Sequence, residues 1–148
     1  MSTTEALEIR SAAARDVAAL AELSEQLGYP STPREVRERL TRLRRAEDHR
    51  VFVAVAADGR LLGWIHAYVA LRIESDPFVE IGGLVVREEA RGRGLGSRLV
   101  AAAEAWARSR GVPKLRVRSR TGRRRAHAFY RRLGFTDAKE QLVLDRQL

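Results

Sequence analysis

The chain has 148 residues, 45% of them hydrophobic, and 28 lysines and arginines oppose 19 acidic residues, which gives a net charge of +9. This composition excludes a disordered chain, and the length suits a single domain over residues 1–148. The absence of cysteine excludes disulfides, thiolate metal sites and a cysteine acyl intermediate. No apolar run approaches the roughly 20 residues of a membrane span. A cytoplasmic protein is therefore expected. The histidines His49, His66 and His127 are not spaced as metal ligands, so no metal site is expected.

Hydrophobic periodicity and turn residues divide the chain into alternating strands and helices. Thr32, Pro33 and Glu35 form an N-terminal capping signature, and Asp58-Gly59 between two apolar runs indicates a hairpin. The predicted strands are 7–10, 51–57, 61–71, 79–86, 115–119 and 135–144, and the predicted helices are 11–27, 32–45, 95–110 and 124–133. This order predicts an α/β fold with one twisted mixed sheet and helices on both faces.

The stretch from Phe78 to Arg110 reads as a strand, a short basic loop and a helix. The loop is rich in glycine and arginine, and the first N–H groups of the helix that follows have no partner within it. With the helix dipole, such a loop suits two phosphates. A turn with glycines for geometry only is the alternative. A dinucleotide fingerprint is excluded because Ser97 stands where its third glycine is needed, and a P-loop is excluded because Ser-Arg follows Gly96.

The positive charge is concentrated around this loop. Residues 87–132 hold fourteen arginines and one lysine against three glutamates, whereas the rest of the chain is slightly acidic. Such an excess suits a ligand with several phosphates, and it suits RNA or DNA equally well. An arginine-rich composition can also reflect a GC-rich genome, so charge alone leaves the three explanations open.

Three motifs together resemble the GNAT superfamily of N-acetyltransferases. They are R-x-x-G-x-G at Arg91, Gly94 and Gly96, E-I-x-x-L-V-V before it (Glu80–Val86), and A-x-x-F-Y-x-x-L-G-F after it (Ala126–Phe135). The resemblance covers nearly the whole chain and implies a GNAT-like fold with acetyl-coenzyme A as co-substrate. It also implies that the strands ending near Val86 and Ser119 splay apart to form the coenzyme cleft. Gly82-Gly83 is compatible with a bulge at that splay.

The resemblance implies two catalytic residues. Glu80 matches the base glutamate of the histone-acetylating members; as alternatives it acts through water, or it anchors a cationic acceptor. Tyr130 matches the tyrosine that donates a proton to the leaving sulfur, and a packed tyrosine is its alternative. Direct transfer needs no covalent enzyme intermediate, which agrees with the absence of cysteine.

The resemblance also implies the coenzyme-binding residues. Leu84 and Val86 match positions whose backbone pairs with the pantetheine arm, and the amide of Val86 or Val85 would polarise the thioester oxygen. Arg123 stands where the family often has asparagine, which weakens the pantetheine contact there, although an arginine could reach a phosphate. Residues that would cradle the pyrophosphate are Arg91, Gly92, Arg93, Gly94, Leu95, Gly96 and Ser97.

The acceptor-binding candidates are aromatic. Trp64, His66 and Tyr68 alternate along one predicted strand, so their rings share one face of the sheet. Tyr29, with Pro30, lies in the segment that borders the acceptor site in the family. Packing of these rings beneath a helix is the alternative to acceptor contact.

Together these features predict an acetyl-coenzyme A-dependent N-acetyltransferase that transfers the acetyl group directly to a primary amine in a ternary complex. The acceptor is expected to be a small molecule, because the R-x-x-A-H-x-F-Y ending resembles members that acetylate small amines, including aminoalkylphosphonates and aminoglycosides. The alternatives are a protein N-terminus or lysine as acceptor, a basic RNA-associated module of this fold, and coenzyme binding without catalysis. Few aromatic residues are available to stack on bases, so nucleic acid is not expected, nor is a membrane. A homodimer paired through the last strand is left open.

Overall fold

The computed structural model describes residues 7–148. The chain divides into two compact units, Met1–Val117 and Arg118–Leu148. The first unit holds the sheet and three of the α-helices, and the second holds the last helix and the C-terminal segment.

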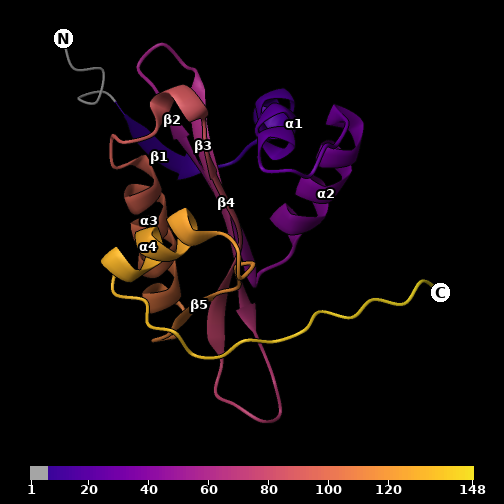
Figure 1. Cartoon of the computed structure of the whole chain (residues 1–148). Helices are drawn as coiled ribbons and strands as arrows, with labels where there is room; N and C mark the ends of the chain where they lie inside the picture. The colour runs from indigo at the N-terminus through magenta and orange to yellow at the C-terminus, as the bar shows by residue number, and fades with distance from the viewer. Residues whose placement is uncertain (1–6) are drawn as a thin grey trace. The chain divides into compact units, whose positions relative to one another are not determined.

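One five-stranded mixed sheet forms the centre of the first unit (Figure 1). The spatial order of the strands follows the chain, and only the last pair, β4 with β5, is parallel. This arrangement confirms the predicted mixed sheet. Its strands are β1 (Glu8–Ser11), β2 (His49–Val55), β3 (Leu61–Ala70), β4 (Phe78–Val86) and β5 (Leu115–Val117).

Three of the four helices begin and end within one residue of their predicted limits. The helix predicted over 11–27 begins instead at Val17, because Ser11 pairs with Phe52 as the last residue of β1. A 3-10 turn, η2 (Ala14–Asp16), precedes α1, and a second, η3 (Glu88–Ala90), follows β4. The capping signature at Thr32 is confirmed, since the Glu35 N–H donates to Thr32 Oγ1 at 3.1 Å and the Thr32 N–H donates to Glu35 Oε1 at 2.9 Å. Across residues 7–148, no helix combines the length and apolar character that crossing a bilayer needs. The α-helices are α1 (Val17–Gln26), α2 (Pro33–Arg45), α3 (Leu95–Ser109) and α4 (Arg124–Arg132).

Helices cover both faces of the sheet in the first unit, as Figure 1 shows. On one face Trp64 of β3 packs against the apolar cluster that includes Leu20 and Leu23 of α1 and Leu40 of α2. The neighbouring Gly63 faces the other side, where a Cβ would lie 3.2 Å from Leu99 of α3. Because successive residues of a strand point to opposite faces, α1 and α2 lie across the sheet from α3.

A β-bulge interrupts β4 at the glycine pair. His66 of β3 pairs with Gly83 whereas the next residue, Ala67, pairs with Ile81, so Gly82 is the extra residue. The expected bulge is confirmed, and it lies where the parallel ladder with β5 ends at Ile81 and Val117.

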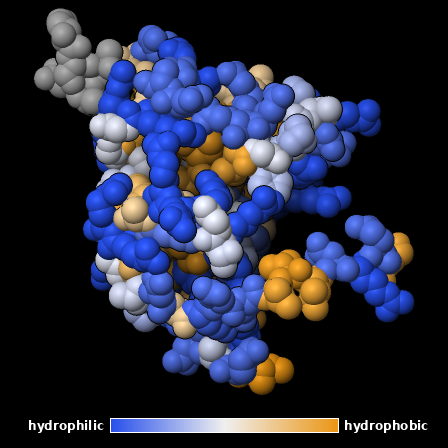
Figure 2. Space-filling view, viewed as in Figure 1, coloured by the Kyte–Doolittle hydropathy of each residue, from blue (hydrophilic) through white to orange (hydrophobic). Residues whose placement is uncertain are grey.

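The strand predicted over 135–144 is wrong. Residues 135–148 are all described and hold no strand, and Leu142, Val143 and Leu144 are exposed at 87%, 82% and 84%. Figure 2 shows orange, hydrophobic side chains along the extended C-terminal segment, in agreement with this exposure. Apolar residues form a stable strand only where a neighbouring backbone supplies hydrogen-bond partners, which the local pattern does not reveal.

Candidate active site

Glu80 lies buried in the middle of β4, with 8% of its surface exposed. Tyr68 of β3 stands opposite it in the ladder, and the Tyr68 hydroxyl donates to Glu80 Oε2 at 2.7 Å. A buried carboxylate with an oriented hydrogen bond can accept a proton or hold a single cation. The sheet therefore brings together one predicted catalytic residue and one predicted acceptor residue.

A histidine pair continues this polar cluster across the sheet. His49 Nδ1 lies 2.9 Å from His66 Nε2, and the His49 ring also stacks on Tyr68 with centroids 5.1 Å apart. Burial, with a smaller contribution from His49, lowers the pKa of His66 to about 4, so His66 is neutral at neutral pH. The spacing of the histidines along the sequence does not indicate that His49 has a partner. The register of the β2–β3 hairpin brings His49 opposite Tyr68.

Within residues 7–148, the structure has no group of three or more side chains suited to holding a metal ion.

A pocket of about 390 Å³ opens beside this cluster, between the α1–α2 layer and the sheet. Three of the four acceptor candidates, Tyr29, Trp64 and His66, line it, and Tyr68 packs on His66 with ring centroids 5.6 Å apart. Ser24, Ser31, Arg39 and Gly82 add polar or small surface. The aliphatic lining residues are Leu20, Leu27, Val36, Leu40, Leu43 and Val51.

The bulge shapes the sheet side of this pocket. A Cβ on Gly82 would lie 2.9 Å from His66 Nδ1, so a larger residue would displace the imidazole ring. On the pocket-lining Trp64, the Nε1 donor is buried without a hydrogen-bond partner in the described part of the chain. A buried donor without a protein partner is commonly satisfied by a water molecule.

The outer edge of β4 becomes available beyond the last β5 pair. The Arg87 N–H donates to Leu62 O at 2.7 Å, and because antiparallel hydrogen bonds alternate, Val85 also directs its backbone groups toward β3. Leu84 and Val86 direct theirs to the opposite side, past the point where pairing with β5 stops. These two residues fit the extended, amide-containing arm of coenzyme A.

The glycine-rich loop leads directly into α3. Gly94 has φ 77° and ψ 13°, in the left-handed region, and serves as the N-cap. Among described residues, no side chain caps this helix, so its first turn, which contains Leu95, Gly96 and Ser97, keeps backbone N–H groups for a ligand. A Cβ on Gly92, where φ is 80°, would meet no atom within 4 Å, so the loop backbone is open to a guest. Together with Arg91 and Arg93, the loop fits a pyrophosphate.

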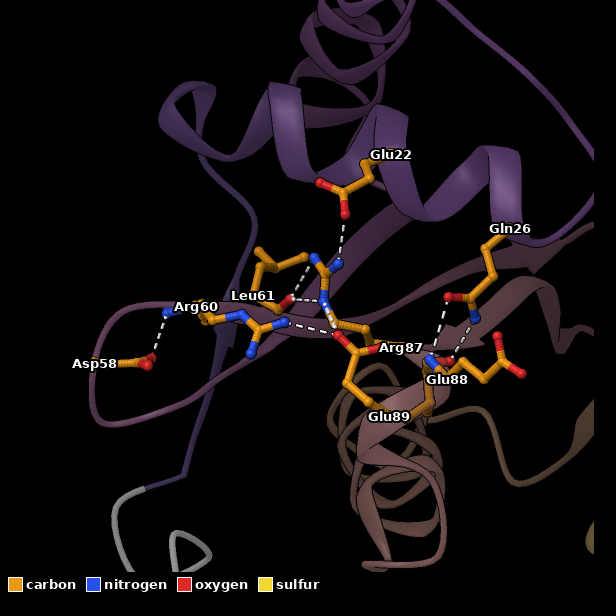
Figure 3. Close-up of polar contacts among 9 residues, drawn as sticks. Glu22, Gln26, Asp58, Arg60, Leu61, Arg87, Glu88 and Glu89 are labelled. Carbon is orange, nitrogen blue, oxygen red and sulfur yellow. Dashed lines mark hydrogen bonds and ion pairs between the residues drawn. The ribbon is translucent and has the colours of Figure 1, made fainter.

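A clamp between α1 and the end of β4 was not foreseen from the sequence (Figure 3). Gln26 Nε2 donates to Val86 O at 2.8 Å, and the Glu88 N–H donates to Gln26 Oε1 at 3.2 Å. Arg87 reinforces the junction, with Nε and Nη2 each 3.1 Å from Leu61 O and Nη1 paired with Glu22 Oε1. The clamp therefore links the helix that lines the pocket to the strand that fits the coenzyme arm.

Tyr130 and Arg123 lie in the second unit. Arg123 immediately precedes α4 as its N-cap, and the Tyr130 ring packs edge-on against Phe129 and Phe135 with centroids 5.0 and 5.3 Å away. Burial raises the pKa of Tyr130 to about 12, against a smaller lowering by the charge of Arg123. The phenol therefore keeps its proton throughout the neutral and moderately alkaline range.

Known proteins of the same architecture were found by sequence and by structure. Residues 16–135 match the model of the acetyltransferase (GNAT) family. The chain is 36% identical over 137 residues to an aminoglycoside N(6')-acetyltransferase type 1 of Stenotrophomonas maltophilia, covering 88% of this chain and 87% of that protein.

Solved structures agree on the fold. The aminoglycoside acetyltransferase AAC(6')-Iy, in complex with a bisubstrate analogue of coenzyme A and acetylneamine, superposes with a TM-score of 0.84 at 20% identity, covering 96% of this chain and 99% of that one. An acetyltransferase of Trypanosoma brucei has a TM-score of 0.79 at 26% identity, covering 95% and 99%. The chain belongs to the GNAT family of acetyltransferases.

Proposed function

We propose that the protein is an N-acetyltransferase that moves the acetyl group of acetyl-coenzyme A directly onto the primary amine of a small molecule. The observation that carries this proposal is the arrangement along β4. Buried Glu80 accepts from Tyr68, whose ring packs on the pocket-lining His66. From four residues further along β4, the backbone groups of Leu84 and the N–H of Val86 face the edge that β5 leaves unpaired. One strand thus presents a proton acceptor and a coenzyme-binding edge.

Each part of the reaction has a residue of this chain. Glu80, directly or through water, takes the proton that the ammonium group must lose before the amine attacks the thioester carbon, or it anchors the cation. The Val86 N–H stabilises the oxygen of the tetrahedral intermediate, a role for which its orientation favours it over Val85. Tyr130 gives its proton to the departing thiolate as the carbon–sulfur bond breaks. Acetyl-coenzyme A supplies the activated acetyl group when bound.

Coenzyme binding rests on the loop and the edge of β4. Backbone N–H groups of residues 92–97 hold the pyrophosphate, assisted by Arg91 and Arg93. Arg123 replaces the amide contact of many relatives with a charge that suits phosphate. The family match over residues 16–135 crosses the boundary between the two units, which supports treating residues 1–148 as one catalytic domain.

Calorimetry with acetyl-coenzyme A and with dephospho-coenzyme A tests the donor. We expect binding in the range of roughly 1–100 μM for acetyl-coenzyme A and weaker binding without the 3′-phosphate, since the surrounding arginines favour charge. The absence of binding to both would contradict the proposal and turn attention to the basic RNA-associated alternative.

A small-molecule acceptor is favoured because the pocket is bordered by α1, α2 and the sheet and has a volume of about 390 Å³, and because the Stenotrophomonas relative is named for a small amine. Acetylation of a protein N-terminus or lysine remains the second acceptor class. A cytoplasmic location and a homodimer remain predictions.

A further inference from the structure

The acceptor pocket has the wrong charge for a polycation. Among the described residues that line it there is no carboxylate, and its one charged side chain is the cation Arg39. Arg39 Nη1 donates to Ser31 Oγ at 2.8 Å, and Nη2 lies 3.5 Å from Glu35 Oε2. His66 adds no charge, because its pKa is lowered to about 4. The lining is therefore apolar or neutral apart from one arginine already held in place.

The helix that carries Arg39 strengthens this bias. α2 has six arginines against two glutamates, Glu35 and Glu38, so the helix as a whole carries a net positive charge. A ligand with several ammonium groups would meet this charge without a carboxylate in the lining to offset it. A ligand with one ammonium group has a candidate partner in Glu80, because the Tyr68 ring that donates to Glu80 packs on the pocket-lining His66.

The size and chemistry of the lining describe the rest of the acceptor. Six aliphatic side chains and Trp64 surround a volume of about 390 Å³, which falls in the range of sites for small organic molecules. Burying an alkyl or aryl group in this pocket removes apolar surface of both the ligand and the protein from water.

We propose that the acceptor is a monoamine with an apolar alkyl or aryl body, and that the chain discriminates against polycationic aminoglycosides. This inference rests on the proposed acetyltransferase activity and names the substrate class of the same site.

The test compares kcat/KM, from release of the coenzyme A thiol, for a series from ethylamine to 4-phenylbutylamine and for kanamycin. We expect kcat/KM to rise about fourfold for each added buried methylene, and the best arylalkylamine to exceed kanamycin at least about tenfold. Preference for kanamycin, or no rise along the series, would overturn the inference. After such a result, the calorimetric control separates the two proposals. If acetyl-coenzyme A does not bind, the proposed acetyltransferase function has failed as well. If acetyl-coenzyme A binds, only the proposed acceptor class has failed.

Two matched variants locate the discrimination. Arg39→Glu reverses the charge at the pocket, and Arg37→Glu makes the same change on an exposed residue of α2 that does not line it. Relative to Arg37→Glu, Arg39→Glu should raise the ratio of kcat/KM for kanamycin to kcat/KM for the best arylalkylamine about tenfold or more. Equal effects of the two variants would show that the pocket charge does not select the acceptor. Thermal melting of both variants checks folding, and the amine series on the unmodified protein tests the inference independently.

Discussion

His66 shows how a single ring depends on its surroundings. The imidazole is buried against His49 and Tyr68, and this environment lowers its pKa to about 4. In the unfolded chain the same group binds a proton near pH 6.5. Because the folded state resists protonation, the contribution of His66 to stability is complete above about pH 6.5 and is lost as the pH falls toward 4.

We therefore expect the unmodified protein to lose on the order of 3 kcal/mol through His66 between about pH 7 and pH 4. His66→Gln should show a correspondingly shallower loss. Urea unfolding of both proteins at several pH values measures the difference. Parallel curves for the two proteins would contradict the assignment.

Replacing Glu80 by Gln should lower turnover at neutral pH by roughly 10²–10⁴-fold, because an amide cannot accept the amine proton. Tyr68→Phe is the matched control, since it removes the 2.7 Å hydrogen bond and keeps the carboxylate. It should cost about tenfold or less. A pH–rate profile of Glu80→Gln identical in shape to that of the unmodified enzyme would exclude the role of a base.

Tyr130→Phe should reduce kcat and leave the affinity for acetyl-coenzyme A nearly unchanged. The pKa of about 12 keeps the phenol protonated, so the unmodified enzyme should lose no activity through this group below about pH 11. Phe135→Leu, which alters the packing of the ring without removing the hydroxyl, is the control. Equal losses in kcat and coenzyme affinity would assign Tyr130 a packing role.

At the scale of elements, the clamp of Figure 3 joins α1 to the end of β4. The Gln26 side chain donates to Val86 O and accepts from the Glu88 N–H, so it bonds to the residues on both sides of Arg87. These two bonds hold the end of the strand that carries the Val86 N–H. A misplaced amide would stabilise the oxyanion less well.

Gln26→Ala should therefore lower kcat/KM for acetyl-coenzyme A about tenfold, while KM for the acceptor changes little. Glu25→Ala, an exposed neighbour on the same turn of α1, is the control and should leave both parameters near their original values. Tenfold losses in both variants, or in neither, would contradict a positioning role for Gln26.

Local patterns predicted most elements because their signals lie within a few residues. The capping signature at Thr32 and the hairpin at Asp58-Gly59 each use short-range chemistry, and both were confirmed. The segment 135–144 failed because a strand depends on a partner backbone as well as on its own apolar residues. For the same reason β5 ends at Val117, two residues before the predicted limit.

For the whole molecule, the dominant feature is the uneven charge. Residues 87–132 carry fifteen basic residues against three acidic ones, in the stretch that contains the loop that fits the pyrophosphate. A negatively charged coenzyme should be attracted over a distance comparable to the Debye length, which shrinks from about 10 Å at 0.1 M salt to about 3 Å at 1 M.

The KM for acetyl-coenzyme A should consequently rise several-fold between about 0.05 and 0.5 M salt. The KM for a monoamine that carries no charge besides its ammonium group should change much less over the same range of salt concentration. Steady-state kinetics with each substrate varied in turn measures both effects. A coenzyme KM independent of salt would show that the basic residues serve another purpose.

The sequence by itself determined the family, the mixed sheet, the glycine- and arginine-rich loop before α3 and the motif positions of Glu80 and Tyr130, because each depends on neighbouring residues in a recognisable order. Only the tertiary structure placed His49 against His66, set Gln26 against Val86 and revealed a pocket without a carboxylate among its described lining residues. The two contacts join residues that are 17 and 60 positions apart in the sequence. The pocket is lined by side chains from several helices and strands. Strand register and helix packing create such contacts, and no local pattern encodes them.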